Sequence, residues 1–336
     1  MNAPTHTPGK ELMKAIVFRS YGSPDVLRYE EIETPTPREK EVLIKVRAAA
    51  LNPYDWHFMR GLPYLIRMMA GLRKPKIVRL GFDVAGHVES VGQSVTQFKP
   101  GDEVFGSCSG PYTGAFAEYA CTLESALVTK PNNVTFEQAA AVPMAAFTAL
   151  QGLRKGQIRA GQKVLVNGAA GGVGSLAVQL AKSFGAEVTG VCSTRNVELV
   201  RSIGADRVID YTKQDFTKSG QPYDLILDCV GNHSLLACRR ALTSKGMLVT
   251  AGGKSGRWKM GLTRGLRALV LSRFGSRKLV GVFARSNQED LNIIRELMET
   301  GKVTPVIDRR YPLSETAEAI RYLEEGHARG KVIITS

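Results

Sequence analysis

The sequence predicts a two-domain α/β protein, in which an irregular β-rich segment precedes a doubly wound sheet of six parallel strands. Two observations predict this class. A glycine-rich turn lies between a β-run and an amphipathic helix, and strands and helices alternate from residue 163 onwards. Before that point, short strand-like runs are broken by Gly and Pro. The 336 residues are enough for two domains, each with a core of its own.

The β-rich segment contains five short runs that we expect to be strands, at residues 14–19, 42–50, 84–91, 103–105 and 117–121. Ahead of them, the first dozen residues lack the apolar stretch of a signal peptide, and we expect a disordered lead-in. Nowhere does an apolar run approach the ~18–20 residues that cross a bilayer. These features favour a soluble globular protein.

The glycine-rich turn is the most informative motif of the chain. A β-run at 164–166 leads into the segment from Gly168 to Gly174, and an amphipathic helix and a second β-run at 188–192 follow. Strand, glycine turn, helix and strand form the context of a dinucleotide-binding fingerprint, in which glycines let the backbone approach the pyrophosphate. The free N–H groups at the start of the helix face its negative charge. We therefore expect a dinucleotide site here.

The end of the second β-run indicates which dinucleotide binds. Enzymes that use NAD usually place Asp or Glu there, to hold the ribose 2′-hydroxyl. This chain has Ser193 and Arg195 after Cys192, and no acid. Ser193 can donate a hydrogen bond to a 2′-phosphate, and Arg195 can neutralise it with a forked pair of N–H groups. We expect NADP(H) as the cofactor; the alternative is a surface serine beside a solvated arginine.

The alternation of strands and helices continues after this point. Further strands are expected at 207–211, 223–230, 245–251 and 278–283, which with the first two make the six of a complete doubly wound sheet. The tail then predicts a helix at 287–300, an extended stretch at 305–311, a helix at 314–325 and a last strand at 331–334. This order predicts an enzyme with a cleft between two domains.

Basic residues gather in one segment. Nine lie between residues 254 and 285 with no acid, and they supply most of the net charge of +14. Within this segment Leu262, Leu266, Leu269 and Val270 fall at helical spacing. A basic amphipathic helix can bind an anionic membrane surface or attract an anionic substrate, whereas most charge runs are solvated faces. Both interpretations stay open. No nucleic-acid recognition motif accompanies the charge.

The cysteines indicate a reducing compartment. There are five, an odd number without CxxC spacing: Cys108, Cys121, Cys192, Cys229 and Cys238. We expect reduced, mostly buried thiols in a cytoplasmic protein.

Taken together, these segments resemble the medium-chain dehydrogenase/reductase superfamily, in particular its zinc-independent quinone oxidoreductase branch. The resemblance covers nearly the whole chain and rests on ALNPYD at 50–55, GFDVAG at 81–86 with VG at 91–92, PGDEVFG at 100–106, VP at 142–143 with Thr148, the glycine-rich turn, GAD at 204–206 leading to Tyr211, and GKV at 330–332. It implies a GroES-like β-rich catalytic domain of residues 1–133, completed by 286–336, packed on a Rossmann NADP-binding domain of residues 134–285. It also implies a homodimer.

Zinc-dependent members of this superfamily hold a catalytic zinc with a Cys, a His and a second Cys. The corresponding positions here are Asn52, Phe82 and Met144. An amide, a phenyl ring and a thioether lack the thiolate or imidazole that zinc favours. The four closely spaced cysteines of the structural zinc loop are missing, and the five histidines are scattered. The resemblance therefore implies a protein without a metal.

Without a Lewis acid, hydride transfer depends on orienting the nicotinamide against a ready acceptor, such as a quinone or an activated carbonyl or enone. The resemblance places Asn52 beside the nicotinamide ribose and the substrate carbonyl, where its amide can donate a hydrogen bond. Tyr54, on the same loop, is a candidate proton donor, with an aromatic wall of the cleft as the alternative. Asp55 and Asp83 are expected to be structural.

The resemblance also gives cofactor contacts at strand ends, where open α/β sheets have their ligand crevice. Along the pyrophosphate we expect Ala170, Gly171, Gly172, Val173 and Gly174. At the 2′-phosphate and adenosine end we expect Ser193, Arg195, Tyr211, Cys229, Val230 and Gly231. On the nicotinamide side we expect Asn52, Thr148, Gly252, Gly253 and Phe283, with Lys331 reaching the cleft from the tail.

Three matters stay open at this point. Residues 62–80 form a longer, apolar and basic loop that is either a lid for a bulky hydrophobic substrate or packing between the domains. An alternative activity is reduction of an enoyl or 2-alkenal double bond. A further alternative is a non-catalytic NADPH-binding protein that contacts a membrane surface through residues 254–285.

Overall fold

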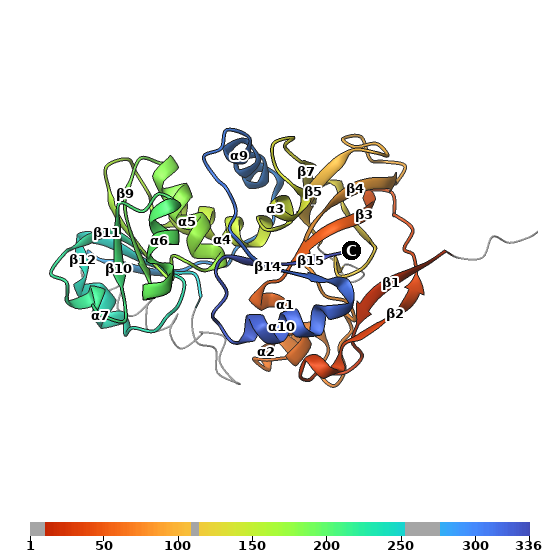
Figure 1. Cartoon of the computed structure of the whole chain (residues 1–336), viewed down its shortest axis with the longest axis horizontal. Helices are drawn as coiled ribbons and strands as arrows, with labels where there is room; N and C mark the ends of the chain where they lie inside the picture. Colours follow the sequence, from red (N-terminus) through yellow and green to blue (C-terminus); the bar gives the residue numbers. More distant parts are fainter. Residues whose placement is uncertain (1–10, 109–113, 253–275) are drawn as a thin grey trace, which may run out of the picture.

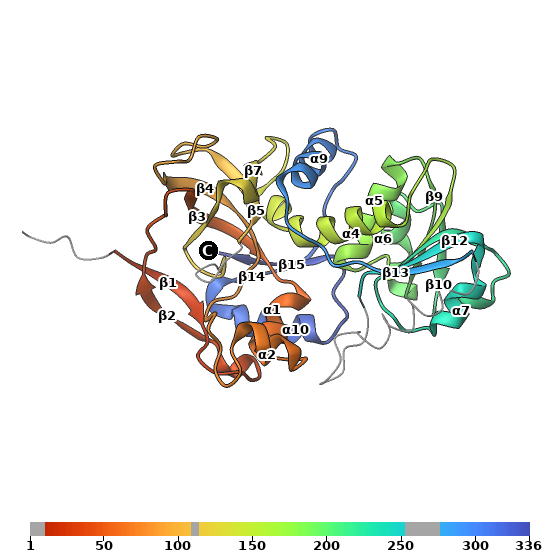
Figure 2. The same ribbon diagram turned by 180° about the vertical axis from the view of Figure 1, so that it is seen from behind.

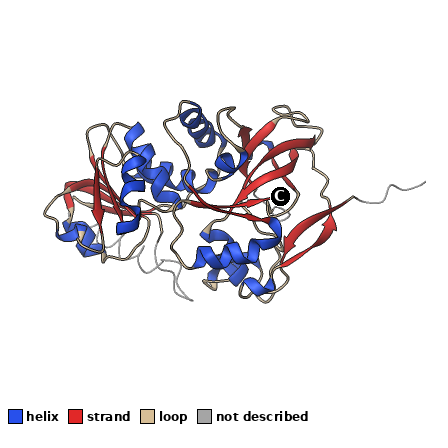
Figure 3. Cartoon of the chain, in the orientation of Figure 1, coloured by secondary structure: helices blue, strands red, loops and turns tan. Residues whose placement is uncertain are grey.

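A computed structural model of the chain describes residues 11–108, 114–252 and 276–336, which form two lobes side by side along the long axis (Figure 1). Gly253 and the predicted amphipathic helix at 262–270 lie outside the described residues. One lobe contains parallel strands flanked by helices, and the other contains most of the antiparallel strands (Figure 3).

The first lobe is built on a six-stranded sheet in the order β10-β9-β8-β11-β12-β13, and every neighbouring pair is parallel. Its strands are β8 (Lys163–Asn167), β9 (Glu187–Cys192), β10 (Arg207–Asp210), β11 (Tyr223–Asp228), β12 (Leu242–Thr250) and β13 (Lys278–Gly281). Numbered along the chain this is the 3-2-1-4-5-6 order of a doubly wound sheet. The prediction of a six-stranded Rossmann sheet is confirmed.

Helices cover this sheet, which explains why its strands are almost continuously apolar. In β8 every residue after Lys163 is buried, and in β11 only Asp224 is less than fully buried. The helices of this lobe are α4 (Pro143–Lys155), α5 (Gly172–Ser183), α6 (Val197–Ser202) and α7 (Leu235–Arg240). α5 packs on β8 and β9, and α7 packs on β12.

The second lobe holds a sheet in the order β14-β15-β3-β4-β5-β7, with β6 also paired to β3, and a separate hairpin of β1 and β2. Its strands are β1 (Leu12–Val17), β2 (Arg28–Glu33), β3 (Glu41–Ala50), β4 (Asp83–Val91), β5 (Glu103–Ser107), β6 (Tyr119–Leu123), β7 (Leu127–Thr129), β14 (Ile307–Pro312) and β15 (Lys331–Thr335). Because β15 pairs antiparallel with β3, the tail completes the N-terminal sheet.

In the described ranges, five helices belong to this lobe or to the boundary between the lobes: α1 (Pro53–Arg60), α2 (Leu65–Ala70), α3 (Phe136–Ala140), α9 (Gln288–Glu299) and α10 (Thr316–Glu324). Short 3-10 turns occupy Pro24–Val26, Glu124–Ala126, Thr194–Asn196, Phe216–Lys218 and Leu313–Glu315. The predictions of α9 and α10 are confirmed. In the described parts of the chain, no helix is both long and apolar enough to cross a membrane.

Two segments predicted as loops are partly helical. Asn52 and Tyr54 do not share a loop, because α1 begins at Pro53 with Asn52 as its N-cap and Asp55 completes a capping box. Pro at the first helical position and a left-handed Gly61 at the end are both standard helix boundaries. The predicted loop at 62–80 contains α2, which packs against α1, as seen from behind in Figure 2.

A shared apolar core holds the two lobes together. Buried residues of the second lobe, among them Ala85 and Phe105, belong to the same cluster as Phe147 of α4 and Val164 of β8. The lobes therefore meet at packed surfaces beneath the site. The limits of the two domains at 133–134 and 285–286 remain predictions.

Candidate active site

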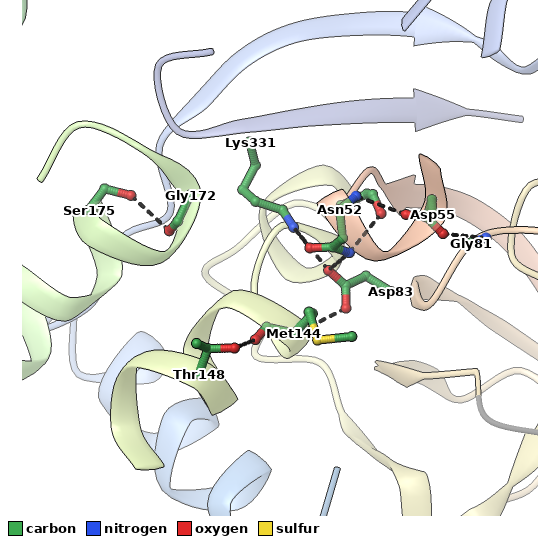
Figure 4. Close-up of polar contacts among 10 residues, drawn as sticks. Asn52, Asp55, Gly81, Asp83, Met144, Thr148, Gly172, Ser175 and Lys331 are labelled. Carbon is green, nitrogen blue, oxygen red and sulfur yellow. Dashed lines mark hydrogen bonds and ion pairs between the residues drawn. The ribbon is translucent and has the colours of Figure 1, made fainter. Parts of the chain in front are cut away.

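Asn52, Asp83 and Lys331 form a buried polar network where the lobes meet (Figure 4). The Asn52 amide donates from Nδ2 to Asp83 Oδ2 at 2.9 Å and to the carbonyl of Ala50 at 3.2 Å. Lys331 Nζ donates to Asn52 Oδ1 at 2.5 Å and lies 3.1 Å from Asp83 Oδ2. Both N–H groups of the Asn52 amide thus donate to protein acceptors. To donate to a substrate oxygen, the amide would have to break one of these two hydrogen bonds.

Asp83 connects this network to α4. Its Oδ1 accepts the backbone N–H of Met144 at 2.8 Å, at the start of the helix. The carboxyl is fully buried, and burial raises the pKa of Asp83, while the charge of Lys331 opposes that rise. Asp83 therefore holds β4, α4 and the last strand in one arrangement, which agrees with the structural role expected for it.

Asp55 fixes the backbone at the start of α1. Its Oδ2 accepts the N–H of Asn52 at 2.8 Å and its Oδ1 accepts the N–H of Gly81 at 2.9 Å. Burial raises the pKa of Asp55 to about 7, although these two backbone hydrogen bonds favour its ionised form. Both carboxylate oxygens bind backbone, as expected for a structural residue.

Tyr54 lies at the surface of the first turn of α1 and is 43% exposed. Its ring centroid is 4.3 Å from that of Phe58 and 5.9 Å from that of Phe82, so the ring forms part of an aromatic wall. Burial of the hydroxyl raises the pKa of Tyr54 to about 12, which keeps it protonated at neutral pH. The geometry therefore suits both roles considered for Tyr54, packing and proton donation.

The glycine-rich turn sits at the start of α5, as the motif predicts. Gly171 is the N-cap and provides no side-chain cap, so the first-turn N–H groups, those of Gly172, Val173 and Gly174, are open to an anion. A side chain at Gly174 would place Cβ 2.0 Å from the carbonyl oxygen of Gly168, and the close packing therefore requires glycine. These features fit a pyrophosphate.

The tail closes over this turn. The N–H of Gly330 donates to the carbonyl of Ala170 at 2.8 Å, and Gly171 and Gly330 form an isolated parallel bridge. The Lys331 side chain then passes beside the helix start, since a Cβ at Gly172 would lie 3.0 Å from Lys331 Cδ. Lys331 thus joins the predicted pyrophosphate site to the Asn52 network, as expected of a residue that reaches the cleft.

Ser193 and Arg195 follow β9, where the sequence placed them, and two tail residues lie beside them. Arg195 Nη2 donates to the carbonyl of His327 at 2.8 Å, and Arg329 Nη2 donates to the carbonyl of Arg195 at 3.4 Å. Ser193 Oγ accepts from Asn196 Nδ2 at 3.2 Å. Sequence reasoning missed Arg329, because the chain order does not reveal that the tail passes the end of β9.

An acid also lies near this position, although none follows β9 in the sequence. Asp210 ends β10 and pairs in register with Cys192. Its carboxylate accepts hydroxyl hydrogen bonds from Thr194 at 2.6 Å and Thr212 at 2.7 Å. The Thr194 bond is the main cause that lowers the pKa of Asp210 to about 2. Asp210 is therefore ionised at neutral pH, and its oxygens are occupied by these threonines.

The remaining predicted contacts lie at the carboxyl edge of the sheet. Asp228 holds the turn after β11, where its Oδ1 accepts from Gly231 N at 2.8 Å, from Val230 N at 3.2 Å and from Asn167 Nδ2 at 2.8 Å. Beside this turn, Gly252 follows β12, and a Cβ there would lie 2.7 Å from the Cys229 carbonyl oxygen.

Three further predicted residues differ in how closely they are held. Tyr211 follows β10 and is 54% exposed, while Phe283 lies two residues beyond the end of β13 and is 75% exposed. The strand that was predicted to run to Phe283 thus ends at Gly281. Thr148, on α4, donates its hydroxyl to the Met144 carbonyl at 2.8 Å and faces the site shown in Figure 4.

Comparison with known proteins is consistent with this geometry. A model of the alcohol dehydrogenase GroES-like domain matches residues 38–132, and a model of zinc-binding dehydrogenases matches residues 203–334. The NADPH-dependent alkenal/one oxidoreductase of Arabidopsis thaliana chloroplasts is 39% identical over 334 residues, which are 96% of this chain and 79% of that protein.

Two further similarities extend over nearly the full length of both partners. The chloroplast envelope quinone oxidoreductase homolog of Arabidopsis thaliana is 35% identical, with 96% of this chain and 98% of that protein covered. The solved quinone oxidoreductase from Coxiella burnetii superposes with a TM-score of 0.85 at 32% identity, over 97% of this chain and 100% of that one. The chain is therefore an oxidoreductase of the medium-chain dehydrogenase/reductase superfamily, and quinone and alkenal oxidoreductases are among its relatives.

Proposed function

We propose that this protein is an NADPH-dependent oxidoreductase that works without zinc and delivers hydride to a quinone or to an activated carbonyl or enone. The observation that carries the proposal is the buried network of Asn52, Asp83 and Lys331. By the resemblance to the superfamily, Asn52 stands at the sequence position of one of the zinc ligands of the zinc-dependent members.

The charges of this network argue against a cation. Lys331 Nζ lies 2.5 Å from Asn52 Oδ1 and 3.1 Å from Asp83 Oδ2, so an ammonium already neutralises the buried carboxylate. A divalent ion at Asn52 would be repelled by this ammonium and would find no thiolate or imidazole. One matching family model is named for zinc-binding dehydrogenases, but this chain has Asn52, Phe82 and Met144 at the ligand positions. The Lys331 ammonium, together with side chains that offer neither thiolate nor imidazole at these three positions, thus supports a mechanism without zinc.

The cofactor proposal is supported at both ends of the predicted crevice. The uncapped start of α5 offers N–H groups to a pyrophosphate, and Arg329 contacts Arg195 after β9, close in sequence to Ser193, where we expect a ribose 2′-substituent. The Arabidopsis alkenal/one relative is named as an NADPH-dependent enzyme. A bound reduced nicotinamide supplies the hydride, and the residues of this chain orient the acceptor.

Two residues have proposed roles at the acceptor. The Tyr54 hydroxyl binds no described residue and lies in the first turn of α1, two residues after Asn52, so we assign it the hydrogen bond or proton to the acceptor oxygen. Asn52 positions the Lys331 ammonium through its amide oxygen. If the Asn52 amide N–H releases Asp83, it can donate to the acceptor instead. The rings of Phe58 and Phe82 pack against the Tyr54 ring and hold it in place.

A second candidate is reduction of the carbon–carbon double bond of an enal or enone. The observation that favours it is the 39% identity to an alkenal/one oxidoreductase, compared with 35% to a quinone oxidoreductase homolog. In this reaction hydride goes to the β-carbon and a proton to the α-carbon, so a proton donor matters more than it does with a quinone. NADPH oxidation measured with matched panels of quinones, enals and simple ketones tests both candidates. Turnover of the ketones alone would reject both.

The cytoplasmic location and the homodimer remain proposals. All five cysteines are free thiols, and Cys229 is the one that is not fully buried, which suits a reducing compartment. Sedimentation equilibrium of the purified chain tests the dimer. Microscopy of the tagged chain in its source cells tests the location.

A further inference from the structure

Residues 56–82 form a basic segment without a single acid, and it follows directly on the first turn of α1. The segment contains six basic residues: Arg60, Arg67, Arg73, Lys74, Lys76 and Arg79. α2 lies inside it and packs against α1 at the lower edge of the β-rich lobe (Figure 2). In the sequence, this segment is distinct from the basic segment at 254–285.

α2 is anchored from its inner side. Ile66 and Ala70, one helical turn apart, are 7% and 2% exposed. The Arg67 guanidinium lies 4.6 Å from the ring centroid of Tyr21 and 5.0 Å from that of Tyr64, and its Nε donates to the Gly61 carbonyl at 3.0 Å. The Tyr21 hydroxyl then donates to the carbonyl of Gly71 at 2.7 Å. The segment is thus held on the lobe by contacts at several points.

The outer side of the same segment is apolar and unpaired. Met68 on α2 is 72% exposed, and Leu72, two residues beyond the end of α2, is 71% exposed. Exposed apolar side chains beside polar residues are a feature of interaction surfaces. Three exposed cations follow immediately: Arg73, Lys74 and Lys76. None of these three cations forms an ion pair with another residue in the described part of the chain.

We propose that residues 64–78, with α2 at their centre, are a docking surface for an anionic lipid membrane. Met68 and Leu72 enter the headgroup region, and Arg73, Lys74 and Lys76 lie against lipid phosphates. Apolar tips next to a run of cations, with no acid within residues 56–82, are complementary to such a surface. The inference goes beyond the proposed function, because it does not depend on which acceptor is reduced.

The geometry disfavours the other occupants. A lid would cover the cleft with its large apolar side chains, but Met68 and Leu72 are 72% and 71% exposed, and the inward residues Ile66 and Ala70 are already buried within the protein. A protein partner is also a poor fit, since protein interfaces are depleted in lysine at their centres. An anionic bilayer matches both the cations and the apolar tips.

Vesicle sedimentation tests the proposal with the full chain and no substrate. We expect binding to vesicles of phosphatidylcholine with phosphatidylglycerol, and little binding to phosphatidylcholine alone. Each cation near an anionic surface contributes about fivefold in partitioning, so the triple variant Arg73→Gln, Lys74→Gln, Lys76→Gln should bind roughly a hundredfold more weakly. The double variant Met68→Ser, Leu72→Ser should lose roughly tenfold or more.

Matched controls separate this surface from net charge. The triple variant Lys40→Gln, Lys99→Gln, Lys245→Gln removes the same charge from three exposed positions elsewhere, and Leu236→Ser removes an apolar side chain that is 54% exposed on α7. Both controls should bind vesicles as the wild type does. Circular dichroism and the thermal midpoint confirm that every variant is folded.

A site-specific probe supplies an independent reading. Met68→Cys labelled with an environment-sensitive fluorophore should shift to the blue on addition of anionic vesicles, while Leu236→Cys should not. Wild-type binding that survives the Met68, Leu72 and cation changes, or an unshifted probe at position 68, would overturn the proposal. Neither result would bear on NADPH-dependent turnover in solution, so the two proposals fail separately.

Discussion

Lys331 Nζ lies 3.1 Å from Asp83 Oδ2, and the two side chains are 5% and 0% exposed. This ion pair joins the last strand of the chain to β4, and Asp83 extends it to the backbone of Met144 at the start of α4. The tail therefore does more than complete a sheet. It supplies the cation that balances the buried carboxylate bound to the Asn52 side-chain amide.

Loss of one member of this pair should destabilise the protein strongly. Lys331→Met leaves Asp83 buried without its cation, and removal of one partner of a buried pair typically costs about 3–5 kcal/mol. We expect a loss of this order in the free energy of unfolding, measured by urea denaturation. The double variant Lys331→Met, Asp83→Leu should cost less than the sum of the two single changes. Strictly additive costs would show that the two charges are not coupled.

Asp55 should make stability depend on pH between about 4 and 7. Its folded pKa is raised to about 7, against about 3.9 for an unfolded aspartate. The folded state thus binds the proton more tightly. This stabilisation is fully present below pH 4 and is lost as the pH rises towards 7, at up to about 1.4 kcal/mol per pH unit.

The comparison variant is Asp55→Asn, which cannot titrate. Urea denaturation at pH 4.5, 5.5 and 6.5 should show the wild type losing stability relative to the variant as the pH increases. If the two curves run parallel, the N–H groups of Asn52 and Gly81 outweigh burial and keep the carboxylate ionised.

The sequence was most informative where local chemistry decides the structure. Six apolar runs and one glycine turn were sufficient for the parallel sheet, because strands buried on both faces are continuously apolar. β2 was missed for the opposite reason: Arg28–Glu33 is rich in charge and has no fully buried residue. α1 was taken for a loop although Asn52, Pro53 and Asp55 form a recognisable helix start.

The site was less predictable, because it depends on residues that are distant along the chain. Arg329 meets Arg195 across 134 positions, and Lys331 meets Asn52 across 279. No local pattern gives such a contact. Asp210 was overlooked because the search for an acid followed β9, whereas β10 lies beside it in the sheet.

Cofactor choice should depend on Arg195 and Arg329. Loss of a charge-assisted hydrogen bond costs about 1.5–3 kcal/mol, or roughly one to two decades in affinity. Arg195→Ala should therefore weaken NADPH binding far more than NADH binding, and Arg329→Ala should act in the same direction. Fluorescence titration measures both dissociation constants, with Arg240→Ala on α7 as the control. Equal affinity of the wild type for the two cofactors would contradict the assignment of Arg195 and Arg329 to a 2′-phosphate.

Metal analysis should find no stoichiometric zinc. The Lys331 ammonium beside Asn52 and Asp83 disfavours a second cation there. We expect elemental analysis to give well under one zinc per chain and a chelator to leave turnover unchanged, with a zinc-dependent alcohol dehydrogenase as the positive control. Activity that is lost to the chelator and restored by zinc would contradict the proposal.

Variants at Tyr54 and Asn52 should show whether each residue takes part in the chemistry or only positions its neighbours. Tyr54→Phe removes a hydroxyl and keeps the ring on Phe58 and Phe82, so packing is preserved. If the hydroxyl donates the proton, turnover should fall more with enals, whose product needs a proton at carbon, than with quinones that take theirs from water. A silent Tyr54→Phe with both acceptors would leave Tyr54 as a wall of the cleft.

Asn52→Ala tests whether the Asn52 amide contacts the acceptor in addition to binding Asp83 and Lys331. If the amide also serves the acceptor oxygen, turnover should fall by up to about 2.7–4 kcal/mol of barrier, the value of one oriented donor in a preorganised site, while NADPH affinity stays nearly unchanged. The loss should lie at or below the lower end, since a quinone is a strong acceptor. Weaker NADPH binding with unchanged turnover would mean that Asn52 only positions Lys331 beside the pyrophosphate site, and that the chemistry rests on other groups.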